Sequence, residues 1–570
     1  MMELDRLAKT TQLLYNALAL DVNRLAQVYF NAISLVRLRD EKGIAGPDMS
    51  TLPLLFARAA EKFATQPALI EPVEGSNEML SLSYQELQEH VHQFAGYLQQ
   101  QGLSQGQRIM IWSPSRANWL ISYFASLLLG LVIVPLDVNT REDFILRLVD
   151  ITETTHLITT HKLYSNLQHS SLAFIDIDSL PSAPLDMTQL PALVETDLAQ
   201  LVFTSGTTGQ PKGVMLSHRN IVSNALGSID AVNIKGDDRA LSILPLSHMF
   251  ELTIDVAILH IGASIVYART LSPDTLFRLL ATQKITCMVL VPQALQLFMN
   301  GVEREVRQQN KEKQWDILHA IAWRVPFKYR ARLFKQVHAR FGGHFRFFVC
   351  GGAYMQPQLG RFWEEMGFRT LQGYGATECA PVISVNPPND HTFGSVGQPL
   401  KGVELRIADD GEIQVHGPNV ALGYWQDPEL TNRTFQDGWY ATGDLGYLDR
   451  HHNLYLKGRK KNLIVLPNGM NVYPEDVENV LQSQEVVKDA VVFGLNERNR
   501  GTAVHAVLLL EDSSQAKTVV KQANKLLAPH QQIKSYTLWS EKDFPRTHTL
   551  KVKRQEVLDK LDKLRSAQRV

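Results

Sequence analysis

The sequence has few of the features that mark secreted, zinc-stabilised or nucleic-acid-binding proteins. It contains only three cysteines among 570 residues, Cys287, Cys350 and Cys379, and they form no C-x-x-C pair or metal-ligand spacing. All three lie in apolar or glycine-rich runs. This usage excludes a disulfide-stabilised scaffold and a zinc motif, and it predicts buried free thiols in a reducing compartment.

An excess of charge of one sign is also lacking. Lys and Arg number 57 and Asp and Glu number 58, so the formal net charge is −1. This balance gives no support for a general nucleic-acid-binding role. We also expect no secretory signal, because Glu3, Asp5 and Arg6 stand near the start and no small-residue cleavage site follows an apolar run. The expected location is cytoplasmic, and membrane association stays open.

Long hydrophobic runs are rare, and one of them needs a test against a membrane span. Ala117–Leu136 is free of charged residues and is long enough to cross a bilayer. A glycine and a proline interrupt it, so that it predicts a buried helix over Trp119–Leu129 and a short strand over Leu131–Val134. The same order of helix, glycine and strand recurs at 252–267. Two such units favour a doubly wound α/β core over a membrane span.

The first 48 residues form a unit of their own. Their apolar residues recur on one helical face from Leu14 to Val36, and glycines and a proline end the unit. The polar face contains only one basic residue, Arg24, whereas interfacial membrane helices usually carry several. We therefore favour docking of this amphipathic helix on the body of the protein or on a partner subunit, with membrane-surface contact as the alternative.

The rest of the chain is too long for one core, so two or more domains are expected. Strands and helices alternate from Leu52 to about residue 380, and short strands with frequent turns follow Gly394. The run Leu454–Lys461 is interpreted as a polar, basic connector. We predict a large α/β domain of doubly wound sheets with a small β-barrel-like subdomain, residues 49–461, followed by a smaller, mobile α+β domain, residues 462–570. The strands expected in the large domain include Ile109–Trp112, Leu157–Thr159, Met288–Val291, Glu404–Ile407 and Glu412–His416.

The stretch Leu201–His218 is the most informative part of the chain. A mostly apolar strand, predicted over Leu198–Phe203, leads into a run rich in glycine, hydroxyl groups and one lysine. Glycines let several backbone N–H groups point toward one anion, and hydroxyls add donors, so the run predicts a polyphosphate site. It is not a Walker A loop, because Pro211 stands where that motif has its Gly-Lys pair. The predicted loop contains Thr204, Ser205, Gly206, Thr207, Thr208, Gly209, Lys212 and Gly213.

Two later stretches provide further parts of a nucleotide site. Small residues follow a predicted strand over Phe345–Cys350 and would let a flat ring lie against the backbone. The run Tyr374–Glu378 supplies an aromatic face, a glycine turn, a hydroxyl and a carboxylate. Adenine can stack on the ring, and the carboxylate suits Mg²⁺, which prefers hard oxygens. Taken alone, small residues after a strand more often indicate a tight turn, and the alternative for Glu378 is a surface ion pair. Their residues are Gly351, Gly352, Ala353, Tyr374, Gly375, Thr377 and Glu378.

Three charged residues in the C-terminal half of the chain complete the candidate site. Asp444 follows a Thr-Gly turn, where its carboxylate can accept hydrogen bonds from ribose hydroxyls. Arg459 can reach ribose or phosphate oxygens with its guanidinium fork. Lys551 lies in a basic stretch on the separate small domain, where it is a candidate for stabilising charge in a transition state. The alternatives are a plain turn, a solvated linker and a basic tail.

These stretches, in this order, resemble the AMP-forming acyl-CoA synthetases, adenylation domains and luciferases, from about residue 50 to 555. The resemblance implies that Thr204 to Lys212 hold the β- and γ-phosphates of ATP and that Glu378, with Thr204, binds Mg²⁺. It implies that Gly351–Ala353 and Tyr374 contact adenine. The remaining implied roles are ribose binding by Asp444 and Arg459, a hinge at Lys461, catalysis by Lys551, and a place near the thiol acceptor for the loop of Gly469.

The resemblance also implies a two-step reaction. A carboxylate attacks the α-phosphate of ATP to give an acyl-adenylate, and a thiol then takes the acyl group. No protein nucleophile is required, and the sequence contains no Ser-His-Asp or Cys-His arrangement. The run Pro245–Glu251 resembles the acyl-pocket segment of fatty acyl-CoA synthetases, which implies that His248 lies by the carboxylate of a medium- to long-chain fatty acid. An ordinary half-buried histidine is the alternative.

The expected cosubstrates and cofactor are ATP, coenzyme A and Mg²⁺. An acyl carrier protein in place of coenzyme A is the first alternative, and a non-catalytic nucleotide- or lipid-binding scaffold is a remote one. A homodimer and peripheral membrane contact stay open. The chain departs from the family pattern at Leu550, where a glycine usually precedes the catalytic lysine, and at Asn462, where an acidic residue usually follows the hinge. Lys553 is therefore an alternative position for the catalytic cation.

Overall fold

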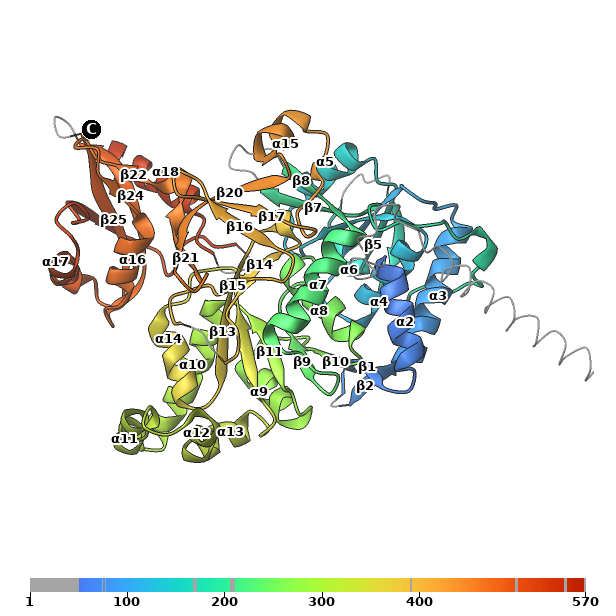
Figure 1. Cartoon of the computed structure of the whole chain (residues 1–570), viewed down its shortest axis with the longest axis horizontal. Coiled ribbons are helices and arrows are strands. Elements are labelled where there is room, and N and C mark those ends of the chain that lie inside the picture. Colours follow the sequence, from blue (N-terminus) through green and yellow to red (C-terminus); the bar gives the residue numbers. More distant parts are fainter. Residues whose placement is uncertain are drawn as a thin grey trace, which may run out of the picture. The chain divides into compact units, whose positions relative to one another are not determined.

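The computed structural model describes residues 51–567 except 74, 77, 168–171, 206–210, 390–391, 498–500 and 548–550 (Figure 1). The helix predicted within residues 1–48 lies outside the described residues. Two large sheets, a smaller antiparallel sheet and a C-terminal α/β part make up the described chain. None of the described helices is both long and apolar enough to cross a membrane.

The first large sheet combines parallel strands with an antiparallel hairpin. Within the described residues its order is β18 (Gly423–Tyr424), β8 (Pro211–Ser217), β7 (Leu198–Ser205), β4 (Val132–Leu136), β3 (Arg108–Trp112), β5 (His156–Thr159) and β6 (Ala173–Asp176). All five residues of β4 are buried, because both faces of this parallel part are covered. The predicted strand ended at Val134, but β4 continues through Pro135 to Leu136 and pairs in parallel with β3.

The second large sheet is parallel in its middle and antiparallel at its ends. Its described order is β15 (Gln398–Pro399), β14 (Val382–Val385), β13 (Arg369–Gly375), β12 (Phe347–Cys350), β11 (Cys287–Leu290), β9 (Arg239–Ser242), β10 (Ser264–Tyr267), β1 (Pro67–Pro72) and β2 (Met79–Ser83). Buried Cys287, Cys350 and Cys379 are all free thiols, as the sequence predicted.

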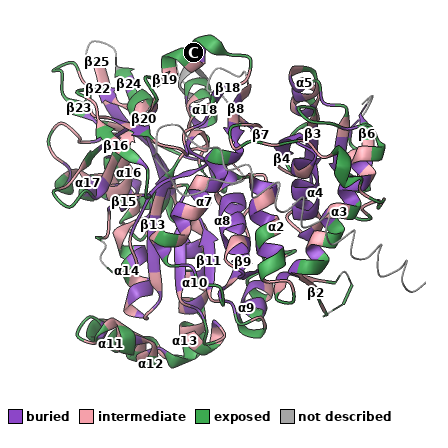
Figure 2. Ribbon diagram, turned by 45° about the vertical axis from the view of Figure 1, so that its right-hand side comes forward, coloured by how far each residue is buried: buried purple, intermediate pink, exposed green. Residues whose placement is uncertain are grey.

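Helices pack between the two large sheets and on their outer faces. The helices that share one hydrophobic core with strands of both sheets are α2 (Leu52–Lys62), α3 (Tyr84–Gln100), α4 (Ala117–Leu128), α7 (His218–Val232) and α8 (Met249–His260). Most residues of α4 and α8 are buried, whereas α2 and α3 are buried on one face and exposed on the other (Figure 2). Outside lie α5 (Glu142–Thr152) and α6 (His161–Tyr164) on one sheet, and α9 (Pro273–Thr282), α10 (Pro292–Gln308), α11 (Glu312–Ala322), α12 (Phe327–Leu333), α13 (Lys335–Arg340) and α14 (Pro357–Glu365) on the other.

The small antiparallel sheet corrects one prediction. Its described strands are β16 (Glu404–Ile407), β17 (Glu412–His416), β20 (Trp439–Leu448), β19 (Phe435–Gln436) and β21 (Leu454–Arg459), with α15 (Pro428–Thr434) beside them. The stretch interpreted as a basic connector from Leu454 is therefore mostly a strand, β21, which pairs with β20. An edge strand needs few apolar residues because its outer side faces water, so its composition resembles that of a linker.

The C-terminal part has its own cores on two faces of a sheet. Strands β24 (Val487–Glu497), β25 (Gly501–Leu510) and β26 (Ser535–Leu538) form the sheet, with α16 (Pro474–Gln482) and α17 (Ala516–Leu526) on one face and α18 (Arg554–Ala567) on the other. A short hairpin of β22 (Ile464–Val465) and β23 (Asn471–Val472) precedes them. The short 3₁₀ turns are η1 (Met187–Gln189), η2 (Thr377–Cys379), η3 (Lys460–Asn462) and η4 (Ser513–Gln515). The predicted α/β fold, with a large sheet domain and a smaller C-terminal domain, is confirmed.

Candidate active site

The predicted phosphate loop is flanked by two antiparallel strands, β7 and β8, which we name the phosphate hairpin. Strand β7 extends two residues beyond its predicted end, and Thr204 and Ser205 pair with Lys212 and Pro211 of β8. Lys212 and Gly213 therefore lie in a strand and not in the loop, because strand pairing with β7 includes both residues. The tip residues Gly206, Thr207, Thr208 and Gly209 lie outside the described residues.

A tyrosine that the sequence did not single out links this hairpin to the predicted magnesium ligand. The Tyr424 hydroxyl donates a 2.9 Å hydrogen bond to Oε1 of Glu378, and Lys212 Nζ lies 6.0 Å from the centre of the Tyr424 ring. β18 pairs with β8, with Tyr424 opposite Val214, and a Cβ at Gly213 would lie 3.0 Å from Cβ of Trp425, the residue after β18. Only the tertiary fold brings Tyr424 to this place, because no local pattern distinguishes it.

Two buried asparagines, Asn224 of α7 and Asn419 in the segment between β17 and β18, hold the segment that contains Glu378. Asn224 Nδ2 donates to the carbonyl oxygens of Cys379, at 3.0 Å, and Val382, at 2.7 Å. Asn419 Nδ2 donates to the same Cys379 oxygen at 3.0 Å. These side chains are buried, and paired buried amides fix the backbone that they contact. They thereby position η2, which contains Thr377 and Glu378. Sequence reasoning missed them because a buried asparagine has no local signature.

Asp444 lies between an aromatic and a cationic partner. Tyr374 donates from its hydroxyl to Oδ2 at 2.6 Å, and Arg459 Nε lies 2.7 Å from Oδ1. Burial raises the pKa of the Asp444 carboxyl, although Arg459 and the Tyr374 hydroxyl act in the opposite direction. Asp444 belongs to β20 and not to a free turn, but the preceding Gly443 has a φ of +70°, so the strand is irregular there. The hydrogen bond from Tyr374 to Asp444 joins the motif predicted to bind adenine to the motif predicted to bind ribose.

The glycines at the carboxyl ends of β12 and β13 allow close backbone contacts. A Cβ at Gly375 would lie 2.1 Å from the carbonyl oxygen of Pro381, so only glycine fits there without movement. Gly351, Gly352 and Ala353 follow β12 directly, and Gly352 has a φ of +80°. The carboxyl ends of strands are where ligands bind in open α/β sheets. Tyr374 itself is buried, with 9% of its surface exposed.

Four cationic residues interact near Asp444: Arg459, Lys461 and Lys551 interact electrostatically with its carboxylate, and Lys212 interacts with Lys461. The pKa of Lys461 is lowered, first by burial and then by repulsion from Arg459 and Lys212. The pKa of Lys551 is also lowered, first because surrounding protein atoms partly desolvate its ammonium group and then because Arg459 repels it, whereas attraction by Asp444 raises this pKa. Both lysine side chains are still exposed to solvent, so a charged ligand can reach them. Such an excess of positive charge suits a polyanion.

The donors present also fit a single magnesium ion that is shared with phosphates. In the described part of the chain, no three His, Cys, Asp or Glu side chains are arranged to hold a metal ion. Glu378 supplies one carboxylate close to the phosphate hairpin through its contact with Tyr424. Magnesium commonly binds through one or two carboxylates together with substrate phosphates and water.

The remaining predicted residues lie at three other places. His248 is exposed and directly precedes α8. Gly469 has a φ of +78° in the turn between β22 and β23, where its N–H donates to the Leu466 carbonyl oxygen at 2.9 Å. Lys461 lies in η3, between β21 and β22. The structure thus brings together the hairpin, Tyr374, Glu378, Asp444 and the four cations.

Comparison with known proteins gives two family matches and several relatives. A model described as AMP-binding enzyme matches residues 56–425, and one described as AMP-binding enzyme C-terminal domain matches residues 461–564. The long-chain-fatty-acid–CoA ligase FadD15 of Mycobacterium bovis is 30% identical, over 80% of this chain and 87% of the relative. The long-chain-fatty-acid–[acyl-carrier-protein] ligase AEE15 of Arabidopsis thaliana is 23% identical, over 81% and 77%.

A solved structure with the same architecture contains the expected ligands. The o-succinylbenzoate coenzyme A synthetase (MenE) of Bacillus subtilis, in complex with ATP and magnesium ion, is 26% identical and superposes with a TM-score of 0.73, covering 88% of this chain and 98% of that one. Its complex with the acyl-adenylate intermediate gives a TM-score of 0.74, with coverages of 88% and 97%.

Proposed function

The chain belongs to the AMP-binding enzyme family, and on that premise we propose that it is an ATP-dependent ligase that activates a medium- to long-chain fatty acid and transfers it to coenzyme A. The proposed products are acyl-CoA, AMP and pyrophosphate. The name of the mycobacterial relative supports the acid and the acceptor. The named ligands of the MenE complexes support ATP, Mg²⁺ and an adenylate intermediate.

The observation that carries the proposal is the cluster of four cationic side chains near the Asp444 carboxylate. Four separate parts of the chain supply these cations: β8 contains Lys212, β21 contains Arg459, η3 contains Lys461, and the C-terminal part contains Lys551. Their electrostatic interactions connect them. A cluster of like charges is unfavourable unless a ligand of opposite charge compensates it. ATP carries that charge, and the Asp444 carboxylate suits its ribose.

In the first half-reaction, a carboxylate oxygen of the fatty acid attacks the α-phosphorus. The bond between that phosphorus and the bridging oxygen breaks, and pyrophosphate leaves with its electron pair. We assign the β- and γ-phosphates to Thr204 and Lys212 with the hairpin tip, and the adenine to the segment from Gly351 to Ala353 with Tyr374. Lys551 stabilises the charge that develops in the transition state. When bound by Glu378 and Thr204, Mg²⁺ would neutralise phosphate charge.

In the second half-reaction, the thiol of coenzyme A attacks the acyl carbon. The bond from that carbon to the adenylate oxygen breaks, so AMP leaves and the thiol proton passes to solvent. The C-terminal domain, which we take as residues 462–570, rotates about Lys461, so that Lys551 withdraws and the loop of Gly469 approaches the thiol path. Residues 49–461 form the adenylating domain in this proposal.

We assign the acid to the segment that begins α8. His248 precedes a helix whose residues are almost all buried, and α10 begins with a largely apolar turn. Apolar walls suit a long acyl chain, while an exposed histidine can contact its carboxylate. No ammonium-binding residue was expected in this segment, so an amino acid is a poor substrate candidate.

Pyrophosphate exchange with a panel of carboxylic acids tests this proposal. Exchange that depends on long-chain fatty acids, and not on amino acids or short acids, is the expected result. Absence of exchange with every fatty acid would contradict it. A carrier protein is the second candidate acceptor, which the similarity to AEE15 favours. Thioester formation with coenzyme A alone supports the first candidate, whereas turnover only with a carrier protein supports the second.

For residues 1–48 we propose docking on the body of the protein or on a partner subunit, with membrane contact as the alternative; both rest on their amphipathic sequence. Liposome flotation of the full chain and of a chain lacking these residues distinguishes the two. Flotation of the full chain alone would support membrane contact, and equal flotation of the two forms, which docking predicts, would contradict a membrane role for this segment.

A further inference from the structure

Lys551 belongs to a pair of antiparallel segments in the C-terminal domain, residues 545–547 and 551–553, which we name the hairpin of Lys551. The N–H of Thr547 donates to the Lys551 carbonyl oxygen at 2.8 Å, and the Lys551 N–H donates to the Thr547 hydroxyl oxygen at 3.1 Å. Arg546 and Val552 form an antiparallel bridge one step further from the tip. The Lys553 N–H closes the hairpin with a 2.8 Å bond to the carbonyl oxygen of Pro545. The backbone of Lys551 is thus fixed relative to Arg546.

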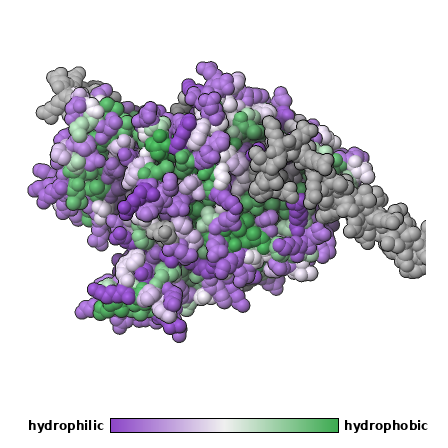
Figure 3. Space-filling view, viewed as in Figure 1, coloured by the Kyte–Doolittle hydropathy of each residue, from purple (hydrophilic) through white to green (hydrophobic). Residues whose placement is uncertain are grey.

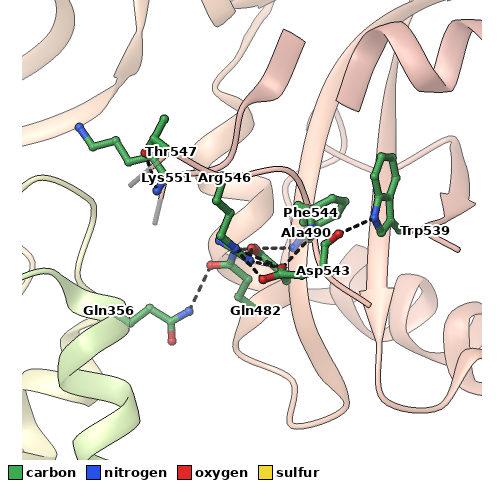
Figure 4. Close-up of polar contacts among 10 residues, drawn as sticks. Gln356, Gln482, Ala490, Trp539, Asp543, Phe544, Arg546, Thr547 and Lys551 are labelled. Carbon is green, nitrogen blue, oxygen red and sulfur yellow. Dashed lines mark hydrogen bonds and ion pairs between the residues drawn. The ribbon is translucent and has the colours of Figure 1, made fainter. Parts of the chain in front are cut away.

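Arg546 fastens one strand of this hairpin to the core of the domain (Figure 4). Its Nη2 lies 2.7 Å from Oδ2 of Asp489 on β24 and 2.7 Å from Oδ1 of Asp543. The Arg546 side chain is 18% exposed and that of Asp489 is 12% exposed, so both charges are largely removed from water. The two carboxylates raise the pKa of Arg546 against the effect of its burial.

Asp489 is itself held in place by neighbouring groups. Its Oδ1 accepts a 2.6 Å hydrogen bond from Gln482 Nε2 and a 2.8 Å bond from the Ala490 N–H. Gln356 of the large domain donates a 3.4 Å bond to Gln482 (Figure 4). A carboxylate with fixed donors offers a fixed anchor for a guanidinium, so the position of Arg546 is determined by β24 and α16.

A second arginine fastens the other strand of the hairpin. Arg554, at the start of α18, pairs with Glu478 of α16 and donates to the carbonyl oxygen of Val492. Its guanidinium carbon lies 5.1 Å from the centre of the Phe493 ring. Burial raises the pKa of Glu478, and Arg554 counteracts this effect.

We propose that Arg546 and Arg554 are positioning residues that clamp the hairpin of Lys551 at both ends, so that its ammonium group is held in place for the adenylation step. The inference rests on the role proposed above for Lys551. A lysine side chain is long and flexible, so its contribution to a transition state depends on how well its backbone is fixed. Removing one partner of a buried ion pair leaves an uncompensated charge, which moves the segment that carried the partner.

Separate measurement of the two half-reactions tests the clamp. The variants are Arg546→Gln, Arg546→Lys and Asp489→Asn, with Lys560→Gln as a matched control that breaks an exposed ion pair to Glu541 in the same domain. We expect Arg546→Gln and Asp489→Asn to lower fatty-acid-dependent pyrophosphate exchange about 10-fold or more, since misplaced catalytic groups cost this much. Arg546→Lys should recover part of the loss. The control should not change the exchange rate.

The second half-reaction separates positioning from a merely structural role. Thioester formation from supplied acyl-adenylate should stay within about twofold of wild type in Arg546→Gln, since Lys551 has withdrawn by then. Equal loss in both half-reactions, together with a lower unfolding temperature, would overturn the clamp, as would unchanged exchange. Lys551→Ala, measured in parallel, separates the two proposals. If it keeps full exchange, the role of Lys551 fails; if it loses exchange while Arg546→Gln keeps it, only the clamp fails.

Discussion

The Tyr374 hydroxyl donates a 2.6 Å hydrogen bond to one oxygen of Asp444, whose other oxygen lies 2.7 Å from Arg459. This contact connects the end of β13 in the second large sheet to β20 in the small sheet. It fixes the orientation of a carboxylate that is 7% exposed. A nucleotide ribose would therefore meet a carboxylate that is already oriented, which lowers the cost of binding.

Removal of this one hydroxyl should weaken ATP binding. Tyr374→Phe keeps the ring and deletes the donor, and a lost hydrogen bond to a charged group costs about 1.5–3 kcal/mol. We expect the KM for ATP in pyrophosphate exchange to rise on the order of 10-fold while the KM for the fatty acid stays unchanged. A rise in both constants would indicate general damage to the large domain and contradict a specific role.

A methyl group at Gly375 should disrupt the end of β13. The new Cβ would lie 2.1 Å from the carbonyl oxygen of Pro381, so the backbone must move, and such overpacking costs about 1–3 kcal/mol. Gly375→Ala should lower both the unfolding temperature and ATP affinity. Gly301→Ala in α10 is the matched control, because its Cβ would be 3.7 Å from the nearest atom. An equal effect of the two substitutions would contradict the close-packing argument.

Two buried carboxyls on α8 should make stability depend on pH. Burial raises the pKa of Asp255 from its ordinary 3.8 to about 8, although its 3.0 Å hydrogen bond from Tyr267 acts against this rise. Glu251, one turn earlier, also has a raised pKa, because of burial and then because of Asp255. Between pH 3.8 and about pH 8, the folded state therefore keeps a proton on Asp255 that the unfolded state has released. The free energy of unfolding falls as the pH rises through this range, by about 1.4 kcal/mol per pH unit for each such group.

Asp255→Asn tests this titration. The amide oxygen can still accept the Tyr267 hydrogen bond, but it does not ionise. Unfolding temperatures measured between pH 5 and pH 8 should decline less in the variant than in the wild type, and the variant should be the more stable protein at pH 8. Parallel curves for the two proteins would show that Asp255 does not titrate in this window.

The affinity for ATP should depend on salt concentration, because four cationic residues, Lys212, Arg459, Lys461 and Lys551, lie at the proposed site. Lys212→Gln removes one positive charge that repels Lys461 and would attract phosphate. ATP affinity measured by titration should fall about 10-fold at low salt, and by less at high salt, because ions screen exposed charges. Lys401→Gln, at an exposed residue in another loop, serves as the control. A loss that is the same at all salt concentrations would point to a structural effect.

Local patterns were sufficient for most elements of the large domain. β16 and β17 have the predicted bounds, β3 and β5 begin one residue before their predicted starts, and β11 is shifted by one residue at both ends. Short apolar runs punctuated by glycine and proline predict such strands reliably because burial on two faces imposes the pattern. β21 and β8 were missed, since the pairing of such polar or glycine-containing strands depends on the partner strand more than on composition.

The candidate site was predictable where one motif contains both the turn and the functional group. Thr204, Glu378 and Asp444 are of this kind, and their binding roles stay predictions. The contacts of Tyr424 with Glu378, of Asn224 with Val382 and of Arg546 with Asp489 were not predictable, because the two partners lie 46 to 158 residues apart in the sequence. The neighbours of a side chain at such a separation are determined by the packing of whole elements, which local sequence does not encode.

The central claim is that a carboxylate oxygen attacks the α-phosphorus of ATP, and isotope transfer tests it most directly. The protein is incubated with a long-chain fatty acid labelled with ¹⁸O in its carboxylate, with ATP, Mg²⁺ and coenzyme A, and the products are analysed by mass spectrometry. The account predicts one ¹⁸O atom in each AMP formed and none in pyrophosphate. Label in inorganic phosphate with formation of ADP, or AMP without label, would contradict it.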